Sequence, residues 1–182
     1  MHRLVLAFLA VALGGLPAAF GQRALRPAGC ATTGRPGDDW TRYPFPGLRL
    51  VLSLPPGLRP LPYEGLRRAG RRAAARSIPM TDADSVELLA AWEAPARSAG
   101  EIRQVLLFSI RPDSVPPGRP CAFAVAGQPG YVFRMALSPD GRAADESRVE
   151  AYWHGFVLAA VGRSMDAYEI VFGILSSIAM LP

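Results

Sequence analysis

Lysine and asparagine are absent from this 182-residue chain, so all 20 of its basic residues other than histidine are arginines. Alanine, glycine and proline are abundant, and the bias is typical of a GC-rich bacterial coding sequence. The preference for arginine is therefore not by itself a sign of bidentate phosphate recognition. The absence of asparagine also excludes an N-glycosylation acceptor.

Motifs for catalysis and metal binding are equally scarce. The chain has 2 histidines, and His154 is the one that lies outside the apolar N-terminal segment. The sequence contains no G-x-S-x-G, no glycine-rich phosphate loop, no C-x-x-C and no H-E-x-x-H. Its one internal histidine and two cysteines lack the spacing of a zinc site. We therefore expect a protein that is not an enzyme and holds no cofactor or metal.

The composition is that of a globular protein. Half of the residues are apolar and 19% are charged, with a formal net charge of +5. A chain of this size and hydrophobicity can bury a core and fits one domain. Global disorder is not expected.

The first residues have the pattern of a secretory signal peptide. Arg3 precedes an apolar stretch from Leu4 to Leu13, which a Gly-Gly-Leu-Pro sequence interrupts. Small residues favour cleavage after Gly21, with cleavage after Ala19 as the alternative. A retained membrane helix is the competing interpretation, but the interruption leaves it short for a bilayer. We predict a signal peptide over residues 1–21 and an exported protein, periplasmic or extracellular.

The two cysteines, Cys30 and Cys121, predict a disulfide, because an even pair in an exported protein is usually oxidised. The bridge would close a loop of about 90 residues and contribute roughly 4–5 kcal/mol in the chain-entropy model. Two alternatives are a free catalytic thiol and, because Ala28 and Gly29 precede Cys30, a lipid-anchored cysteine. The distance of Cys30 from the apolar stretch argues against lipidation.

Residues 22–47 are rich in Gly, Pro, Thr and Asp and are expected to be irregular, with the folded domain at 48–182. Alternating or continuous apolar residues predict strands within 48–54, 101–110, 121–127, 131–138 and 151–162. The last of these is apolar on both faces and is predicted to be one long central strand. Residues 81–95 suit either a short helix or a strand.

The C-terminal segment predicts an amphipathic helix that begins at Asp166, which with Glu169 suits a helix N-terminus. Glu169, Gly173, Ser176 and Ser177 fall on a polar arc. The opposite arc is apolar and is expected to pack on the sheet; it holds Ala167, Ile170, Val171, Ile174, Leu175, Ile178 and Leu181. A membrane span would be apolar all round and about 20 residues long.

The most charged stretch predicts a helix that gathers arginines on one side, at spacings of three and four: Arg67, Arg68, Arg71, Arg72 and Arg76. One interpretation is a binding patch for anionic lipid, polyanionic glycan or nucleic acid. The other is a solvated face without a ligand. Nucleic acid is disfavoured by the export signal, so we expect no nucleic-acid partner.

A candidate ligand site is the sequence Tyr152-Trp153-His154. His154 would lie on the strand face of Tyr152 and could act as a base with an acidic neighbour. The alternative is a histidine at a strand edge or in the core.

The order of these elements resembles the PsbP/DcrB-like superfamily. The resemblance covers residues 48–181 and rests on "LPPG" after a strand, "AGQPGYVFRMAL", "HGFVLAAVG" and the helix "AYEIVFGILSSI". It implies an α/β/α sandwich with a central antiparallel sheet, found in small exported proteins or lipoproteins. The superfamily is functionally mixed, so the resemblance implies no catalytic residues. The arginine-rich stretch and the cysteine pair depart from its pattern.

Together these patterns predict a single α+β domain with a mainly antiparallel sheet, the C-terminal helix and one or two further short helices. The predicted function is a non-enzymatic binding or structural module of the bacterial cell envelope. Its expected partner is an envelope protein or a polyanionic surface, with no transmembrane segment in the mature chain. The alternative function is a weak hydrolase or small-ligand-binding protein that uses Tyr152, Trp153 and His154.

Overall fold

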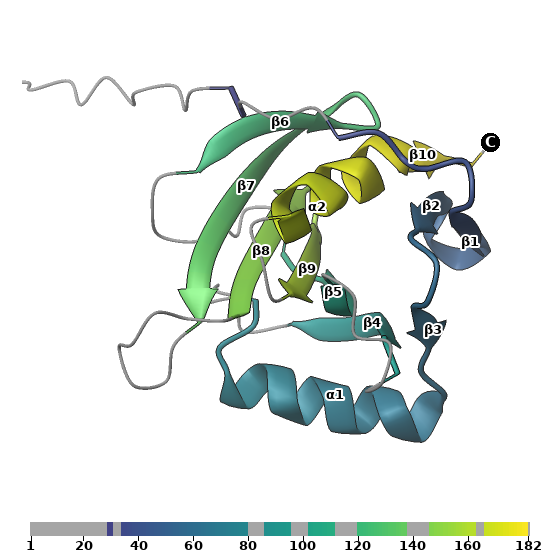
Figure 1. Cartoon of the computed structure of the whole chain (residues 1–182), viewed down its shortest axis with the longest axis vertical. Helices are drawn as coiled ribbons and strands as arrows, with labels where there is room; N and C mark the ends of the chain where they lie inside the picture. Colours follow the sequence, from purple (N-terminus) through teal and green to yellow (C-terminus); the bar gives the residue numbers. More distant parts are fainter. Residues whose placement is uncertain are drawn as a thin grey trace, which may run out of the picture.

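The computed structural model describes residues 29–30, 34–79, 86–95, 102–111, 120–137, 146–162 and 166–181. The predicted signal peptide and residues 80–85 lie outside the described residues. Within the described part, the chain is α+β, and each neighbouring pair of named strands is antiparallel (Figure 1). The predicted fold class is thus confirmed at this level.

The larger sheet has seven strands in the order β3-β4-β5-β9-β8-β7-β6. These strands are β3 (Arg59–Pro60), β4 (Glu87–Glu93), β5 (Ile102–Ser109), β6 (Cys121–Val125), β7 (Gln128–Leu137), β8 (Glu146–Trp153) and β9 (Phe156–Gly162). The ambiguous segment 81–95 therefore contains a strand in its described part. The predicted strands at 101–110 and 131–138 are confirmed over their described residues, as β5 and as part of β7.

A smaller sheet of three strands, in the order β1-β2-β10, stands beside the first. It comprises β1 (Thr41–Phe45), β2 (Leu50–Leu54) and β10 (Ala179–Met180), with a short 3-10 helix, Pro46–Leu48, between β1 and β2. The alternating leucines of β2 were predicted, and the strand ends before Pro55, which cannot donate a hydrogen bond. The expectation of irregular structure over 22–47 is wrong for Thr41–Phe45, which pairs with β2 along its whole length.

The helices α1 (Tyr63–Ala75) and α2 (Asp166–Ser177) contact opposite faces of the larger sheet. Val171, Phe172 and Ile174 of α2 are buried in one cluster with Leu158 of β9. Ala69 and Ala73 of α1 are buried in the other cluster. That second cluster includes Ala159 of β9, which directly follows Leu158 in the chain. Successive strand residues point to opposite faces, so β9 contributes to both clusters.

Two tight hairpins organise the meander β6-β7-β8-β9. The first turns at Ala126–Gly127 and the second at His154–Gly155, and all four residues have positive φ, as a two-residue type I′ turn requires. The long central strand predicted over 151–162 is therefore two strands with a turn between them. Histidine is among the residues enriched at positive φ, which makes His-Gly a turn signal that the apolar pattern concealed.

An N-terminal strap, Gly34–Trp40, crosses the outer side of α2 before the chain enters β1 (Figure 1). Ser176 Oγ donates a hydrogen bond of 2.9 Å to the carbonyl oxygen of Gly34. A Cβ on Gly173 would lie 2.7 Å from the Trp40 ring, so Gly173 is buried under the strap. The helix also ends earlier than its apolar arc suggested, because residues 179–180 pair with β2 as β10.

The contact between the strap and α2 makes glycine necessary at position 34. A Cβ there would overlap backbone atoms of Glu169 and Gly173 and approach Phe172 C at 2.8 Å. We expect Gly34→Ala to lower the free energy of unfolding by about 1–3 kcal/mol, the usual cost of overpacking. Urea unfolding checks this, with Gly47→Ala as the control, since a Cβ there meets nothing within 4 Å. A neutral Gly34→Ala would contradict the packed strap.

Candidate functional site

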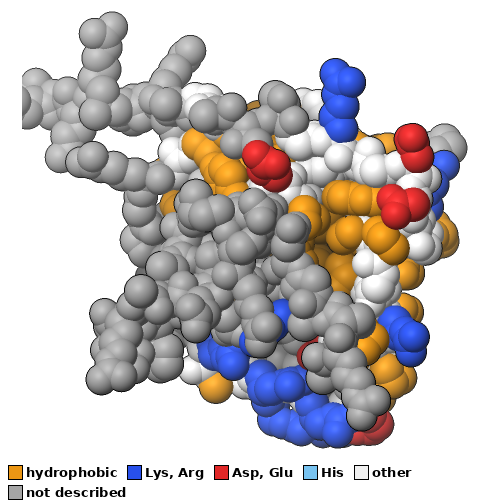
Figure 2. Space-filling model, in the orientation of Figure 1, with side chains coloured by type: hydrophobic (Ala, Val, Ile, Leu, Met, Phe, Trp, Pro, Cys, Tyr) orange, Lys and Arg blue, Asp and Glu red, His pale blue; other side chains and the backbone are white. Residues whose placement is uncertain are grey.

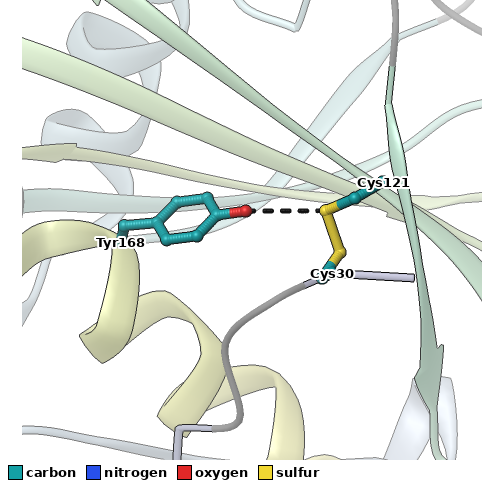
Figure 3. Close-up of a disulfide and its surroundings, with 3 residues drawn as sticks. All are labelled: Cys30, Cys121 and Tyr168. Carbon is teal, nitrogen blue, oxygen red and sulfur yellow. Dashed lines mark hydrogen bonds between the residues drawn. A yellow bond between two sulfur atoms is a disulfide. The ribbon is translucent and has the colours of Figure 1, made fainter. Parts of the chain in front are cut away.

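The cysteine pair is the first of the predicted site features, and its disulfide is confirmed. The Cys30–Cys121 bond joins residues 91 positions apart and ties the segment before the strap to the edge strand β6. The Cys30 amide also donates to the Ala122 carbonyl at 3.0 Å. The hydroxyl of Tyr168, from α2, lies 3.5 Å from Cys121 Sγ (Figure 3). Cys30 therefore has a structural bond, which leaves no thiol for catalysis or lipid attachment.

The arginine-rich helix is the second feature. Gly65, Ala69 and Ala73, four residues apart, form the buried stripe of α1, and their small size allows close approach to β4. Arg67, Arg68, Arg71 and Arg72 occupy its solvent side, and we call them the arginine face; all four are exposed. Figure 2 shows these positive side chains gathered along the lower edge of the molecule, over α1. Arg76 follows the last residue of the helix and is also exposed.

Most side chains of the arginine face have no carboxylate partner among the described residues. Arg72 Nη2 lies 3.0 Å from Glu93 Oε1 of β4, with 61% of the Arg72 side chain still exposed. Within the described residues, no carboxylate pairs with Arg67, Arg68 or Arg71. Exposed guanidinium groups without partners can form hydrogen bonds to an external anion without first breaking an internal pair.

A groove runs beside the helix on this face. It is open to solvent, has a volume of about 590 Å³, and is lined by Arg68, Arg71 and Arg72 together with Leu61, Gly65 and Glu93. Glu93 Oε1 also accepts a hydrogen bond of 2.7 Å from Gln104 Nε2, which holds the carboxylate in place. Three of the predicted patch residues are thus brought together at one concave surface.

The candidate ligand site at Tyr152-Trp153-His154 is not assembled by the structure. Tyr152 and Trp153 are both about 95% buried, and they belong to the core clusters on opposite faces of the sheet. His154 is exposed in the β8–β9 turn with φ of 41°. The expectation that His154 shares a strand face with Tyr152 is therefore wrong, because the turn interrupts the period-two alternation.

A buried polar row, Arg148, Glu150 and Tyr152, is the feature that sequence reasoning missed. Arg148 is 3% exposed and Glu150 is fully buried. Arg148 Nε lies 3.1 Å from Glu150 Oε1, and the Tyr152 hydroxyl donates to Glu150 Oε2. Arg148 Nη1 also donates at 3.0 Å to the carbonyl oxygen of Arg76, at the end of α1.

The sequence signal for this row is the alternation Arg-x-Glu-x-Tyr. Such a pattern is typical of a solvated strand face, so it does not predict burial by itself. Here β8 lies between β7 and β9, and Phe133 and Ala159 flank Glu150 on that face. Burial of both charges is offset by this ion pair and by the hydrogen bonds from Tyr152 to Glu150 and from Arg148 to the Arg76 carbonyl, while the Arg148 Nε–Glu150 Oε1 contact itself lacks hydrogen-bond geometry.

Two further observations concern metals and membranes. In the described ranges, no group of three or more His, Cys, Asp or Glu side chains is placed to hold a metal ion. The same ranges contain no helix with the length and apolarity needed to cross a membrane.

Comparison of the chain with protein-family models, with curated proteins and with solved structures found no match.

Proposed function

We propose that this chain is an exported, non-enzymatic binding module of the bacterial cell envelope, and that the arginine face of α1 is its binding surface. The observation that carries the proposal is the exposed cluster of Arg67, Arg68 and Arg71, which have no carboxylate partner in the described part of the chain. The partner is accordingly an anionic component of the envelope.

Export is supported by the signal-like sequence over residues 1–21 and by the Cys30–Cys121 disulfide, since such bonds persist in oxidising compartments. The periplasm or the extracellular space fits both features. The antiparallel sheet with α1 on one face and α2 on the other supports a place in the PsbP/DcrB-like superfamily. The same arrangement supports a single folded domain, and β1 belongs to that domain.

The hydrolase alternative is not proposed, because it required Tyr152, Trp153 and His154 to converge. The two aromatic side chains lie on opposite faces of the larger sheet. The histidine is exposed at the turn that follows them.

The triple variant Arg67→Gln, Arg68→Gln, Arg71→Gln tests the binding surface. We expect its free energy of unfolding to stay within about 0.5 kcal/mol of wild type, because exposed side chains without partners contribute little to stability. Urea unfolding checks this. A larger loss would mean that the arginines have a structural role.

The same triple variant is expected to lose retention of anionic envelope components by immobilised protein. The control is the triple variant Arg35→Gln, Arg42→Gln, Arg49→Gln, which removes the same charge from exposed positions outside α1. Components retained by wild type and by the control, but not by the α1 variant, support the proposal. Equal retention by all three proteins would contradict it.

A further inference from the structure

The groove beside α1 indicates which class of anionic partner the arginine face would bind. We propose that it binds a linear polyanion other than nucleic acid, a sulfated glycan or a polyphosphate chain, and that Glu93 competes with the polymer for Arg72. This inference rests on the proposed function, in which the arginine face is the binding surface. It adds that the ligand is an extended polymer and that Glu93 lowers the affinity of the protein for this polymer.

The spacing of the arginines suits a chain of anions. Arg68 lies three residues before Arg71 and four before Arg72, which corresponds to roughly 4.5–6 Å along the helix axis. Each guanidinium presents a planar fork of donors that matches a sulfate or phosphate oxygen pair. Successive anionic groups of one extended polymer can therefore each meet an arginine of the groove.

A lipid bilayer fits this surface less well than a polymer does. A helix that lies on a membrane buries an apolar side in the lipid, but the apolar stripe of α1 packs against the sheet. Among the described residues, Tyr63 is the exposed large apolar side chain on α1, and it stands at the first position of the helix. The cations Arg68, Arg71 and Arg72 line one open groove, along which an extended polymer chain can lie.

Glu93 occupies the place of an anionic ligand at one wall of the groove. Its Oε1 atom accepts hydrogen bonds from Arg72 Nη2 at 3.0 Å and from Gln104 Nε2 at 2.7 Å. A sulfate or phosphate group that binds Arg72 through Nη2 must displace this carboxylate, and one that binds the other guanidinium donors is repelled by the negative charge of Glu93. Glu93 therefore lowers the affinity for polyanions.

The test measures binding of the oxidised protein to heparin, to inorganic polyphosphate and to anionic phosphatidylglycerol vesicles. We expect Arg68→Gln/Arg71→Gln to weaken polymer binding by about tenfold or more, since charge-assisted contacts are lost. We expect the charge-matched control Arg35→Gln/Arg42→Gln, at exposed positions outside α1, to change it by less than about threefold, because long-range attraction is screened by salt. Glu93→Gln is expected to tighten polymer binding about threefold, because Arg72 is released.

The outcomes separate this inference from the function on which it rests. Tighter binding to vesicles than to either polymer would overturn the groove as a polymer site while leaving the arginine face as a binding surface. Weaker polymer binding by Glu93→Gln would overturn the competition. If no α1 variant changes the binding of heparin, polyphosphate or vesicles, the proposed function would be overturned as well.

Discussion

Glu150→Ala is expected to lower the free energy of unfolding by about 3–5 kcal/mol, the range for removal of one partner from a buried ion pair. Glu150 is fully buried, and its two oxygens meet Arg148 and the Tyr152 hydroxyl. The substitution leaves the Arg148 guanidinium, itself 3% exposed, without this carboxylate. Urea unfolding followed by circular dichroism gives the change directly.

Two further variants establish the cause of this loss. Glu87→Ala removes an exposed carboxylate from β4 and is expected to change stability by less than about 0.5 kcal/mol. The triple variant Arg148→Met, Glu150→Leu, Tyr152→Phe removes every polar group of the row together. We expect it to be more stable than Glu150→Ala, because no charge is left unpaired. A triple variant less stable than Glu150→Ala would contradict this account.

Removal of the disulfide by Cys30→Ser/Cys121→Ser is expected to cost about 4–5 kcal/mol in the chain-entropy model. The bond closes a loop between residues 91 positions apart, and the constraint acts mainly on the unfolded chain. We therefore expect the folded variant to keep its far-ultraviolet circular dichroism spectrum while its urea midpoint falls. Reduced wild-type protein should behave in the same way.

Thiol chemistry provides the control for this second prediction. Titration of the oxidised protein in denaturant should find no free thiol, since both cysteines are in the bond. Two titratable thiols would show that the bond is absent from the protein. A double variant that loses less than about 1 kcal/mol would show that the unfolded chain is already compact near this loop.

Several strands were predictable because their signal is local. Alternating or continuous apolar residues predicted Leu50–Leu54, Ile102–Ser109 and the described part of 131–138, and all three lie in sheets. The error at 151–162 arose because apolar residues continue on both sides of His154–Gly155. Pattern alone does not show whether a chain reverses there, whereas the positive φ of both residues does.

The candidate site was predicted in part, for the same reason. Helical spacing is a local property, and it correctly placed Arg67, Arg68, Arg71 and Arg72 on the solvent side of α1. The groove depends on Glu93, which is distant in sequence and reaches Arg72 only because β4 packs under the helix. The burial of Glu150 was missed because an alternating charged strand is usually solvated.

By itself, the sequence determined the features that depend on neighbours along the chain: the period-two strands, the helical arginine spacing and the lack of common catalytic motifs. It also determined the pairing of the cysteines, because only two are present. Tertiary structure decided which surfaces meet. It laid Gly34 against α2, packed β4 under α1 so that Glu93 meets Arg72, and enclosed Arg148 with Glu150. The physical reason is that burial and pairing depend on segments distant in sequence, whose positions no local pattern specifies.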